Sequence, residues 1–259
     1  MNDKEAILLA GGSGSRLSPF TFYTSKHLLP IDNVPMIFYP LKNLALLRVS
    51  KVFLIVNENH LNQWNKLISE YDFNMEIVLV VQDKPLGIPD AILKCESKIK
   101  GDSFVVSLGD NVIIASNFIN RCKESFSKND YATICAFTVS DAKPFGVAKF
   151  DDHGSLIEII EKPDNPPSNK AIVGFYNFPK NSFEKIKDLE FSDRGELEIA
   201  DLINAYIAEN RCKLIESDSI SDFWLDTGTN ESMVLATNFV RDLKRNNGLE
   251  IGQFNPKEV

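Results

Sequence analysis

The chain has 259 residues, of which 44% are hydrophobic and 25% are charged, as expected for a globular protein with a sizeable core. Its net charge of −8, from 28 basic and 36 acidic residues, argues against nucleic acid or an anionic membrane as a partner. The four cysteines form no C-x-x-C pair, which argues against a zinc site or a disulfide framework. The polar N-terminus is unlike a signal peptide, and no apolar run reaches the length of a membrane span. We therefore expect a cytoplasmic protein with buried free thiols.

Short apolar strands alternate with helical patterns through the first half of the chain. The expected strands of this half are residues 5–10, 51–56, 75–81 and 103–108, and the expected helices are 36–48, 61–71 and 88–98. This alternation predicts right-handed βαβ units on a largely parallel sheet. In such a sheet ligands bind beyond the carboxyl ends of the strands, so the loops that follow the strands deserve most attention.

From residue 131 the pattern changes to strands separated by turns. The expected elements are strands 131–139, 147–150, 156–160, 171–178 and 212–216, and helices 196–208 and 230–245. Residues 246–259 lack periodicity and are expected to form a loosely held tail. We predict an α/β, Rossmann-like, three-layer domain over residues 1–248, with a mixed, mainly parallel central sheet and a small antiparallel extension. Its two halves would span about 1–130 and 131–248, followed by a tail at 249–259.

A glycine-rich loop follows the first expected strand and contains Gly11, Gly12, Gly14 and Arg16. It is not a Walker loop, because no Gly-Lys pair follows, and it is not a dinucleotide fingerprint, because Leu17 replaces the third glycine. Free backbone N–H groups in such a turn can bind phosphate with nearby cations. A plain tight turn explains the glycines equally well.

Several charged residues also follow expected strands. Asp110 and Asp226 are candidate Mg²⁺ ligands, since this cation prefers oxygen and usually binds one or two carboxylates. Each is equally compatible with a turn or a helix cap. Glu161 and Lys162 suit a sugar phosphate, although an ordinary charged strand end has the same composition. The chain offers no G-x-S-x-G motif and no histidine or cysteine cluster, so a hydrolase triad is poorly supported.

Taken together and in order, these segments resemble the sugar-1-phosphate nucleotidyltransferases, among them most closely the glucose-1-phosphate thymidylyltransferases. The segments that carry the resemblance are residues 9–19, 25–30, 35–41, 108–111, 145–147, 161–163, 194–199 and 224–229. The resemblance implies a Mg²⁺-dependent enzyme that condenses an NTP (dTTP or UTP) with a sugar 1-phosphate, glucose 1-phosphate being the first choice. The products would be an NDP-sugar and pyrophosphate. A homo-oligomer is also implied, as a dimer or tetramer.

The resemblance further implies a role for each matching residue. The nucleotide would be bound in the first half of the chain by Leu9, Gly11, Gly12, Gly14, Gln82 and Gly87. The sugar phosphate would be bound mainly in the second half, by Asn111, Gly146, Glu161, Lys162 and Val173. The catalytic residues would be Arg16, Lys26, Asp110 and Lys162, and the metal ligands Asp110 and Asp226.

Three positions depart from the usual pattern of this family. His27 stands where glutamine is usual, Val173 where threonine is usual, and residues 87–91 read G-I-P-D-A where G-L-A-Q-A is usual. The metal and phosphate residues are unaffected, but the base and the sugar are left open. One alternative is the same reaction with another base or with an amino or deoxy sugar phosphate. The other is a catalytically silent subunit that binds NDP-sugars.

Overall fold

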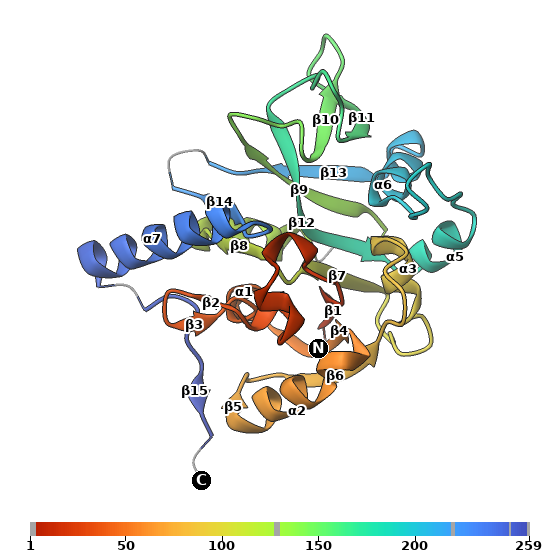
Figure 1. Cartoon of the computed structure of the whole chain (residues 1–259). Helices are drawn as coiled ribbons and strands as arrows, with labels where there is room; N and C mark the ends of the chain where they lie inside the picture. Colours follow the sequence, from red (N-terminus) through yellow and green to blue (C-terminus); the bar gives the residue numbers. More distant parts are fainter. Residues whose placement is uncertain (1–3, 127–129, 219–220, 249, 258–259) are drawn as a thin grey trace.

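The computed structural model describes residues 4–126, 130–218, 221–248 and 250–257. Its centre is a mixed sheet of nine strands in which four parallel strands form one half (Figure 1). These are β1 (Lys4–Ala10), β4 (Val49–Val56), β6 (Glu76–Val81) and β7 (Ser103–Leu108), in the order β7-β1-β4-β6. The direction of winding reverses at β1, where open α/β sheets bind their ligands.

The second half of the sheet is joined to the first by β12 (Lys170–Pro179), which pairs antiparallel with β7. The strands that pair with β12 or extend from it are β9 (Ala132–Thr138), β10 (Gly146–Phe150), β11 (Leu156–Glu161) and β13 (Cys212–Glu216). The turn between β10 and β11 closes at Asp151, whose side chain accepts from two backbone N–H groups. The mixed extension predicted from the sequence is therefore confirmed.

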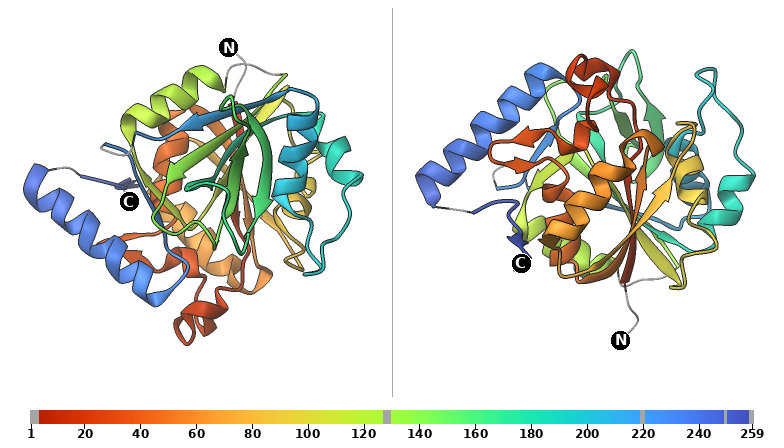
Figure 2. Two further views of the ribbon diagram at one scale, coloured as in Figure 1. Left: turned by 90° about the horizontal axis from the view of Figure 1, so that it is seen from above. Right: turned by 60° about the horizontal axis from the view of Figure 1, so that its bottom comes forward.

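Helices cover both faces of the sheet, because side chains of each strand alternate between two cores. Ala6 and Leu8 of β1 belong to one core cluster, whereas Ile7 belongs to the other. The first face is covered by α1 (Phe38–Leu46), α2 (Leu61–Glu70), α4 (Ser116–Ser125) and α7 (Asn230–Asn247). The other is covered by α3 (Ile88–Leu93), α5 (Ser182–Lys187) and α6 (Ile199–Ala208) (Figures 1 and 2). The three-layer α/β architecture is confirmed.

Two predicted helices differ from the observed limits by three residues or more. Helix α3 ends at Leu93 and continues as turns, rather than reaching residue 98. Helix α6 begins at Ile199 rather than 196, because Leu197 forms a parallel bridge to Gly87 and donates its N–H to Leu86 O. Helix α7 begins with a capping box in which Thr229 and Ser232 exchange side chain–backbone hydrogen bonds.

Several short elements were not predicted. Besides α4 and α5, they include the paired strands β8 (Asn111–Ile114) and β14 (Phe223–Asp226), and the pair β2 (Pro30–Ile31) and β3 (Val34–Pro35). Short 3-10 helices follow β1 and β4: η1 (Ser15–Leu17), η2 (Phe20–Phe22), η3 (Lys26–Leu28) and η4 (Glu58–His60). These elements shape the loops beyond the parallel strands.

The expectation of a loose C-terminal tail is wrong for residues 250–257. There β15 (Asn255–Pro256) pairs with β5 (Tyr71–Asp72), beside which it lies in Figure 1. Phe254 is 7% exposed, and its ring lies 4.9 Å from that of Phe73 and 5.4 Å from that of Phe38. Burial of this aromatic side chain, together with the strand pairing and the hydrogen bond from Lys257 N to Glu70 O, holds a segment that shows no periodicity. Residues 249, 258 and 259 lie outside the described part of the chain.

Two further expectations concern cysteines and membranes. The cysteines are free thiols; Cys95, Cys122 and Cys135 are buried, and Cys212 is partly buried. Burial raises the pKa of Cys95 to about 12, which keeps this thiol neutral and unreactive. Among the described residues, no helix has the length and apolarity needed to cross a membrane.

Candidate active site

A cleft of about 210 Å³ lies beyond the carboxyl ends of the parallel strands β1, β6 and β7. Seven of the predicted residues line it: Leu9, Gly11, Gly12, Lys26, Gln82, Gly87 and Asp110. They come from three loops that are far apart in the sequence. Parallel strands bring these loops to one edge of the sheet, as the strand order requires.

The glycine-rich loop is shaped by close contacts with two side chains of the cleft. A Cβ at Gly11 would lie 2.8 Å from Gln82 Oε1, so only glycine admits Gln82 here. Gly14 has φ +64°, and a Cβ there would lie 3.0 Å from Lys26 Cβ. Gly14 is not among the residues that line the cleft, and its position lets the Lys26 stem cross the loop.

Lys26 and Asp110 form an ion pair at the centre of the cleft. The two side chains are only 13% and 17% exposed. Burial alone would raise the pKa of Asp110, but the charge of Lys26 and hydrogen bonds from Lys26 and Asn111 lower it to about 2. Asp110 is therefore ionised at neutral pH.

Asp226 lies beside Asp110 because β14 pairs with β8 in a register that sets Asp226 opposite Asn111. Burial and the negative charge of Asp110 raise the pKa of Asp226, whereas Lys26 and Arg16 oppose this shift. No third His, Cys, Asp or Glu completes a metal-binding group among the described residues. Two neighbouring carboxylates nevertheless suit Mg²⁺, which takes its other ligands from substrate phosphates and water.

Arg16 reaches this carboxylate pair across Gly228. A Cβ at Gly228 would lie 2.7 Å from Arg16 Nη2 and 3.4 Å from Asp226 Oδ2. The guanidinium of Arg16 thus lies over the backbone that follows Asp226. An exposed cation at the rim and a buried one, Lys26, flank the two carboxylates, an arrangement that suits a polyphosphate bound through a metal ion.

Asn111 is a structural residue of the site. It is 4% exposed, and its Oδ1 accepts from Gly174 N at 3.1 Å and from Trp224 Nε1 at 2.8 Å. Its Nδ2 donates to Asp110 Oδ1 at 3.0 Å. The amide therefore ties β8 to β12 and β14 and orients Asp110, and its contact with a sugar phosphate stays a prediction.

The other predicted sugar-phosphate residues gather at the β10–β11 hairpin. Gly146 pairs with Glu161, and a Cβ at Gly146 would lie 3.2 Å from Glu161 Oε2. Lys162 is half exposed, has φ +43°, and lies 3.4 Å from Glu161 Oε1, which Arg194 Nη2 also approaches at 3.4 Å. These residues lie near one another but do not line the cleft described above. Val173 is fully buried in the core, so its side chain cannot line an open sugar site.

Some cleft residues had no predicted role. His27 is 2% exposed and lies 3.2 Å from Ser25 Oγ through Nδ1. Burial and the charge of Lys26 lower its pKa to about 3, so this imidazole is neutral. The other additional lining residues are Pro85, Ile88, Leu108 and Glu196. Two features of the sequence could have indicated these residues. His27 departs from the usual family pattern, and Glu196 lies in the segment 194–199 that matches the family.

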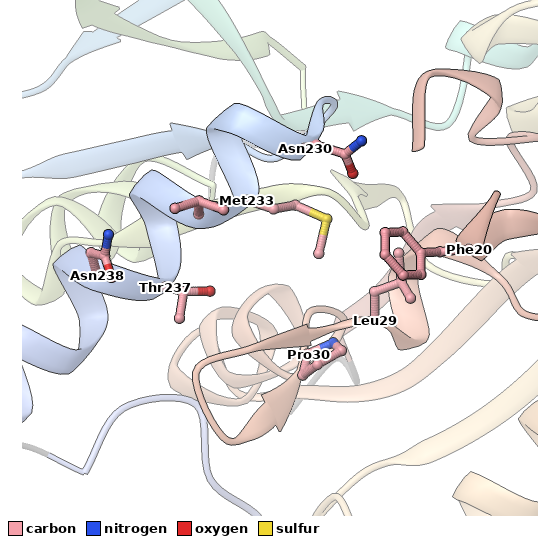
Figure 3. Close-up of a pocket in the computed structure, with 8 residues that line it drawn as sticks. Phe20, Leu29, Pro30, Asn230, Met233, Thr237 and Asn238 are labelled. Atoms are coloured by element: carbon pink, nitrogen blue, oxygen red, sulfur yellow. The ribbon is translucent and has the colours of Figure 1, made fainter. Parts of the chain in front are cut away.

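A second, apolar pocket of about 440 Å³ lies elsewhere, between α7 and the segment around η2 and β2. Figure 3 shows Phe20, Leu29 and Pro30 on one side and Met233 and Thr237 of α7 on the other. None of the predicted site residues lines it. The polar cleft is therefore the better candidate for the active site.

The fold and this cleft are those of a nucleotide-processing α/β enzyme, and comparison with known proteins supplies the family. The chain belongs to the nucleotidyl transferase family, whose sequence model matches residues 5–242. It is 34% identical over 252 residues to glucose-1-phosphate thymidylyltransferase of Xanthomonas campestris, covering 97% of this chain and 85% of that protein. It is 35% identical over 248 residues to the enzyme of the same name from Neisseria meningitidis, covering 95% and 86%.

Solved structures agree with these sequence comparisons. A Bacillus anthracis protein described as a glucose-1-phosphate thymidylyltransferase, in complex with sucrose, superposes with a TM-score of 0.82 at 34% identity. The match covers 92% of this chain and 95% of that one. A UDP-glucose pyrophosphorylase complexed with UDP-glucose has a TM-score of 0.83 at 20% identity, over 93% and 99% of the two chains, which shows a shared fold. The family predicted from the sequence motifs is thus confirmed.

Proposed function

We propose that this chain transfers a nucleotidyl group from dTTP or UTP to a sugar 1-phosphate, with glucose 1-phosphate as the first choice. The observation that carries the proposal is the pair of carboxylates, Asp110 and Asp226, which β8 and β14 hold side by side between Lys26 and Arg16. The names of the relatives at 34–35% identity support the same substrates.

The chemistry requires positioning and charge neutralisation rather than a covalent intermediate. A phosphate oxygen of the sugar 1-phosphate attacks the α-phosphorus, the new O–P bond forms, and the bond from the α-phosphorus to the bridging oxygen breaks as pyrophosphate leaves. Lys26 would face the α-phosphate. Arg16 would neutralise the departing β- and γ-phosphates.

Asp110 and Asp226 would hold Mg²⁺, which supplies positive charge to the phosphates of the bound nucleotide. The raised pKa of Asp226 supports this assignment, because burial and the charge of Asp110 disfavour its ionised form, and a bound divalent cation would favour that form. Lys162, on the hairpin, would contact the phosphate of the sugar. Glu161 and Gly146 would lie beside the sugar.

The base would be recognised by Gln82, whose amide offers paired donor and acceptor groups in the cleft. The backbone of Gly87 lines the same cleft and would complete the base pocket. We further propose that the enzyme is a cytoplasmic homo-oligomer. The buried free thiols Cys95, Cys122 and Cys135 support a reducing compartment.

Pyrophosphate release, measured over a matrix of nucleoside triphosphates and sugar 1-phosphates with Mg²⁺, tests the proposal. Release with dTTP or UTP and glucose 1-phosphate is expected. Release only with GTP or CTP would refute the base assignment, and release only with an amino or deoxy sugar phosphate would refute the sugar assignment. If binding is detected but no pair releases pyrophosphate, the chain is the silent binding subunit instead.

The role of Asp110 is tested with Asp110→Asn, which should abolish turnover by removing a metal-binding charge. The matched control is Asp102→Asn, an exposed carboxylate before the opposite end of β7. Wild-type turnover in Asp110→Asn would exclude Asp110 as a ligand. Equal losses in both variants would point to the fold rather than to the metal.

A further inference from the structure

Asp90, near the start of α3, makes a direct contact with Gln82, the candidate base-reading residue. Gln82 Nε2 donates a hydrogen bond to Asp90 Oδ2 at 3.2 Å. Gln82 is 6% exposed, so its amide has little freedom to find other partners. Asp90 stands at a position where the sequence departs from the usual family pattern.

Resting on the proposed function, we infer that Asp90 is a specificity-determining residue that locks the Gln82 amide in the orientation suited to uracil or thymine and unsuited to cytosine. A carboxylate has acceptors only, so it must face the NH₂ of the amide and cannot face the oxygen. The orientation of Gln82 is thereby fixed by chemistry.

The remaining polar groups of the amide are left for a ligand. Once one N–H is bonded to Asp90, Gln82 retains its second N–H and Oε1. Oε1 lies against Gly11, at 2.8 Å from where a Cβ of that residue would stand, and both residues line the cleft. Gln82 therefore presents one donor and one acceptor in a fixed order.

This fixed order distinguishes the pyrimidine bases. Uracil and thymine offer the N3–H donor beside a carbonyl oxygen, whereas cytosine offers an N3 acceptor beside an amino donor. The two patterns are opposite, so an amide that matches one must flip to match the other. Asp90 prevents that flip, since flipping would set Gln82 Oε1 against a carboxylate oxygen and leave both without a donor.

Asp90 is itself held in place by the backbone around it. The bridge between Gly87 and Leu197, and the hydrogen bond from Leu197 N to Leu86 O at 2.9 Å, fix the start of α3. A Cβ at Gly87 would lie 2.1 Å from Leu197 O, so the close approach requires glycine. The backbone that carries Asp90 is thereby fixed at the start of α3, next to Gln82.

The test is the base selectivity of Asp90→Asn, an isosteric change that lets residue 90 either donate or accept. We expect the ratio of kcat/KM for UTP over CTP to fall by about tenfold or more, mainly through a gain with CTP. Asp83→Asn is the control: it removes the same charge from an exposed residue next to Gln82 and should leave the ratio unchanged.

A double variant shows whether Asp90 acts through Gln82. In a Gln82→Ala background, Asp90→Asn should not change the UTP/CTP ratio further. An unchanged ratio in Asp90→Asn alone, or an equal change in both backgrounds, would overturn the inference. A general structural role would alter the rates with both nucleotides by the same factor and leave the ratio constant.

Equilibrium binding of UTP and CTP, measured by calorimetry, separates this inference from the proposed function. If the wild type binds UTP more tightly than CTP and Asp90→Asn loses that preference, the inference stands even if no pyrophosphate is released. If wild type releases pyrophosphate and Asp90→Asn keeps its preference, the proposed function stands and the inference is wrong. If wild type binds neither nucleotide, both are wrong.

Discussion

Thr227 binds the backbone carbonyl of Asp110 twice, through its N–H at 3.2 Å and through Oγ1–H at 2.7 Å. Thr227 is completely buried and immediately follows Asp226. These two bonds continue the pairing of β14 with β8 beyond its last registered pair. They fix the spacing of the two carboxylates that would hold the metal.

Thr227→Val should therefore lower the affinity for Mg²⁺ while lowering the free energy of unfolding only slightly. The valine retains the shape but loses the hydroxyl donor, which costs about 1 kcal/mol of unfolding free energy. We expect the Mg²⁺ concentration needed for half-maximal rate to rise several-fold. Thr227→Ser keeps the donor and should retain the wild-type Mg²⁺ dependence; a shift as large as that of the valine variant would contradict the explanation.

Asp226→Asn should stabilise the protein in the absence of Mg²⁺ while destroying its activity. The pKa of Asp226 is raised, so its ionised form is disfavoured in the folded protein and carries a penalty at pH values above that pKa. The penalty disappears as the pH falls and Asp226 is protonated. Asparagine removes it at pH 7, which should raise Tm.

Thermal unfolding with and without Mg²⁺ measures this effect. Mg²⁺ should raise the Tm of the wild type and have a smaller effect on Asp226→Asn, because only the wild type has two carboxylates to neutralise. A lower Tm for the variant than for the wild type without Mg²⁺ would show that no electrostatic conflict exists.

His27 should make stability depend on pH in a defined window. Its pKa is about 3 in the folded protein and near 6.5 when unfolded, so between these values the unfolded chain binds the extra proton. Stability therefore falls as the pH drops from about 6.5 toward 3. Relative to pH 7, the contribution at pH 5 is a loss of about 2 kcal/mol.

Urea unfolding of wild type and His27→Gln at pH 7 and pH 5 isolates this contribution, because His60 and His153 are common to both proteins. Between pH 7 and pH 5, the free energy of unfolding of the variant should fall by about 2 kcal/mol less than that of the wild type. Equal decreases in the free energy of unfolding of the two proteins would show that His27 is protonated in the folded protein at pH 5.

Gly228→Ala should displace the guanidinium of Arg16. The new Cβ would lie 2.7 Å from Arg16 Nη2, the end of a flexible side chain that can move aside. We expect little change in Tm and a decrease of about tenfold in kcat/KM for the nucleotide. In an Arg16→Ala background the substitution should have no further effect; an additional tenfold loss would place its action elsewhere.

Much of the fold was predictable because the central strands are continuous apolar runs bounded by glycines or polar loops. Strand β7 was predicted with its observed limits, and β1 and β6 differ by one residue. Helix α4 was missed because its few buried apolar side chains, Phe118, Ile119 and Cys122, stand among polar residues in a short segment. The tail was misjudged because the buried ring of Phe254 and the two-residue strand β15 anchor it without any periodic pattern.

The sequence predicts the part of the site that is built from loops following parallel strands, because those loops meet at one edge of the sheet. The cleft residues Lys26, Gln82 and Asp110 come together for that reason. The position of Asp226 depends instead on the pairing of two four-residue strands, whose register no local pattern reveals. The side chain of Val173 lies in the core because of the packing of β12, which residue identity alone does not determine.

Strand β12 has a mechanical consequence for catalysis. It is hydrogen-bonded along one edge to β7 of the nucleotide half and along the other to β9 of the sugar half. A hinge rotation between the halves would break these ladders, so the sheet behaves as one stiff plate. The β10–β11 hairpin joins β12 through a single registered pair, Val147 with Ala171, so we expect any movement of Lys162 toward the carboxylate pair to come from bending at this hairpin.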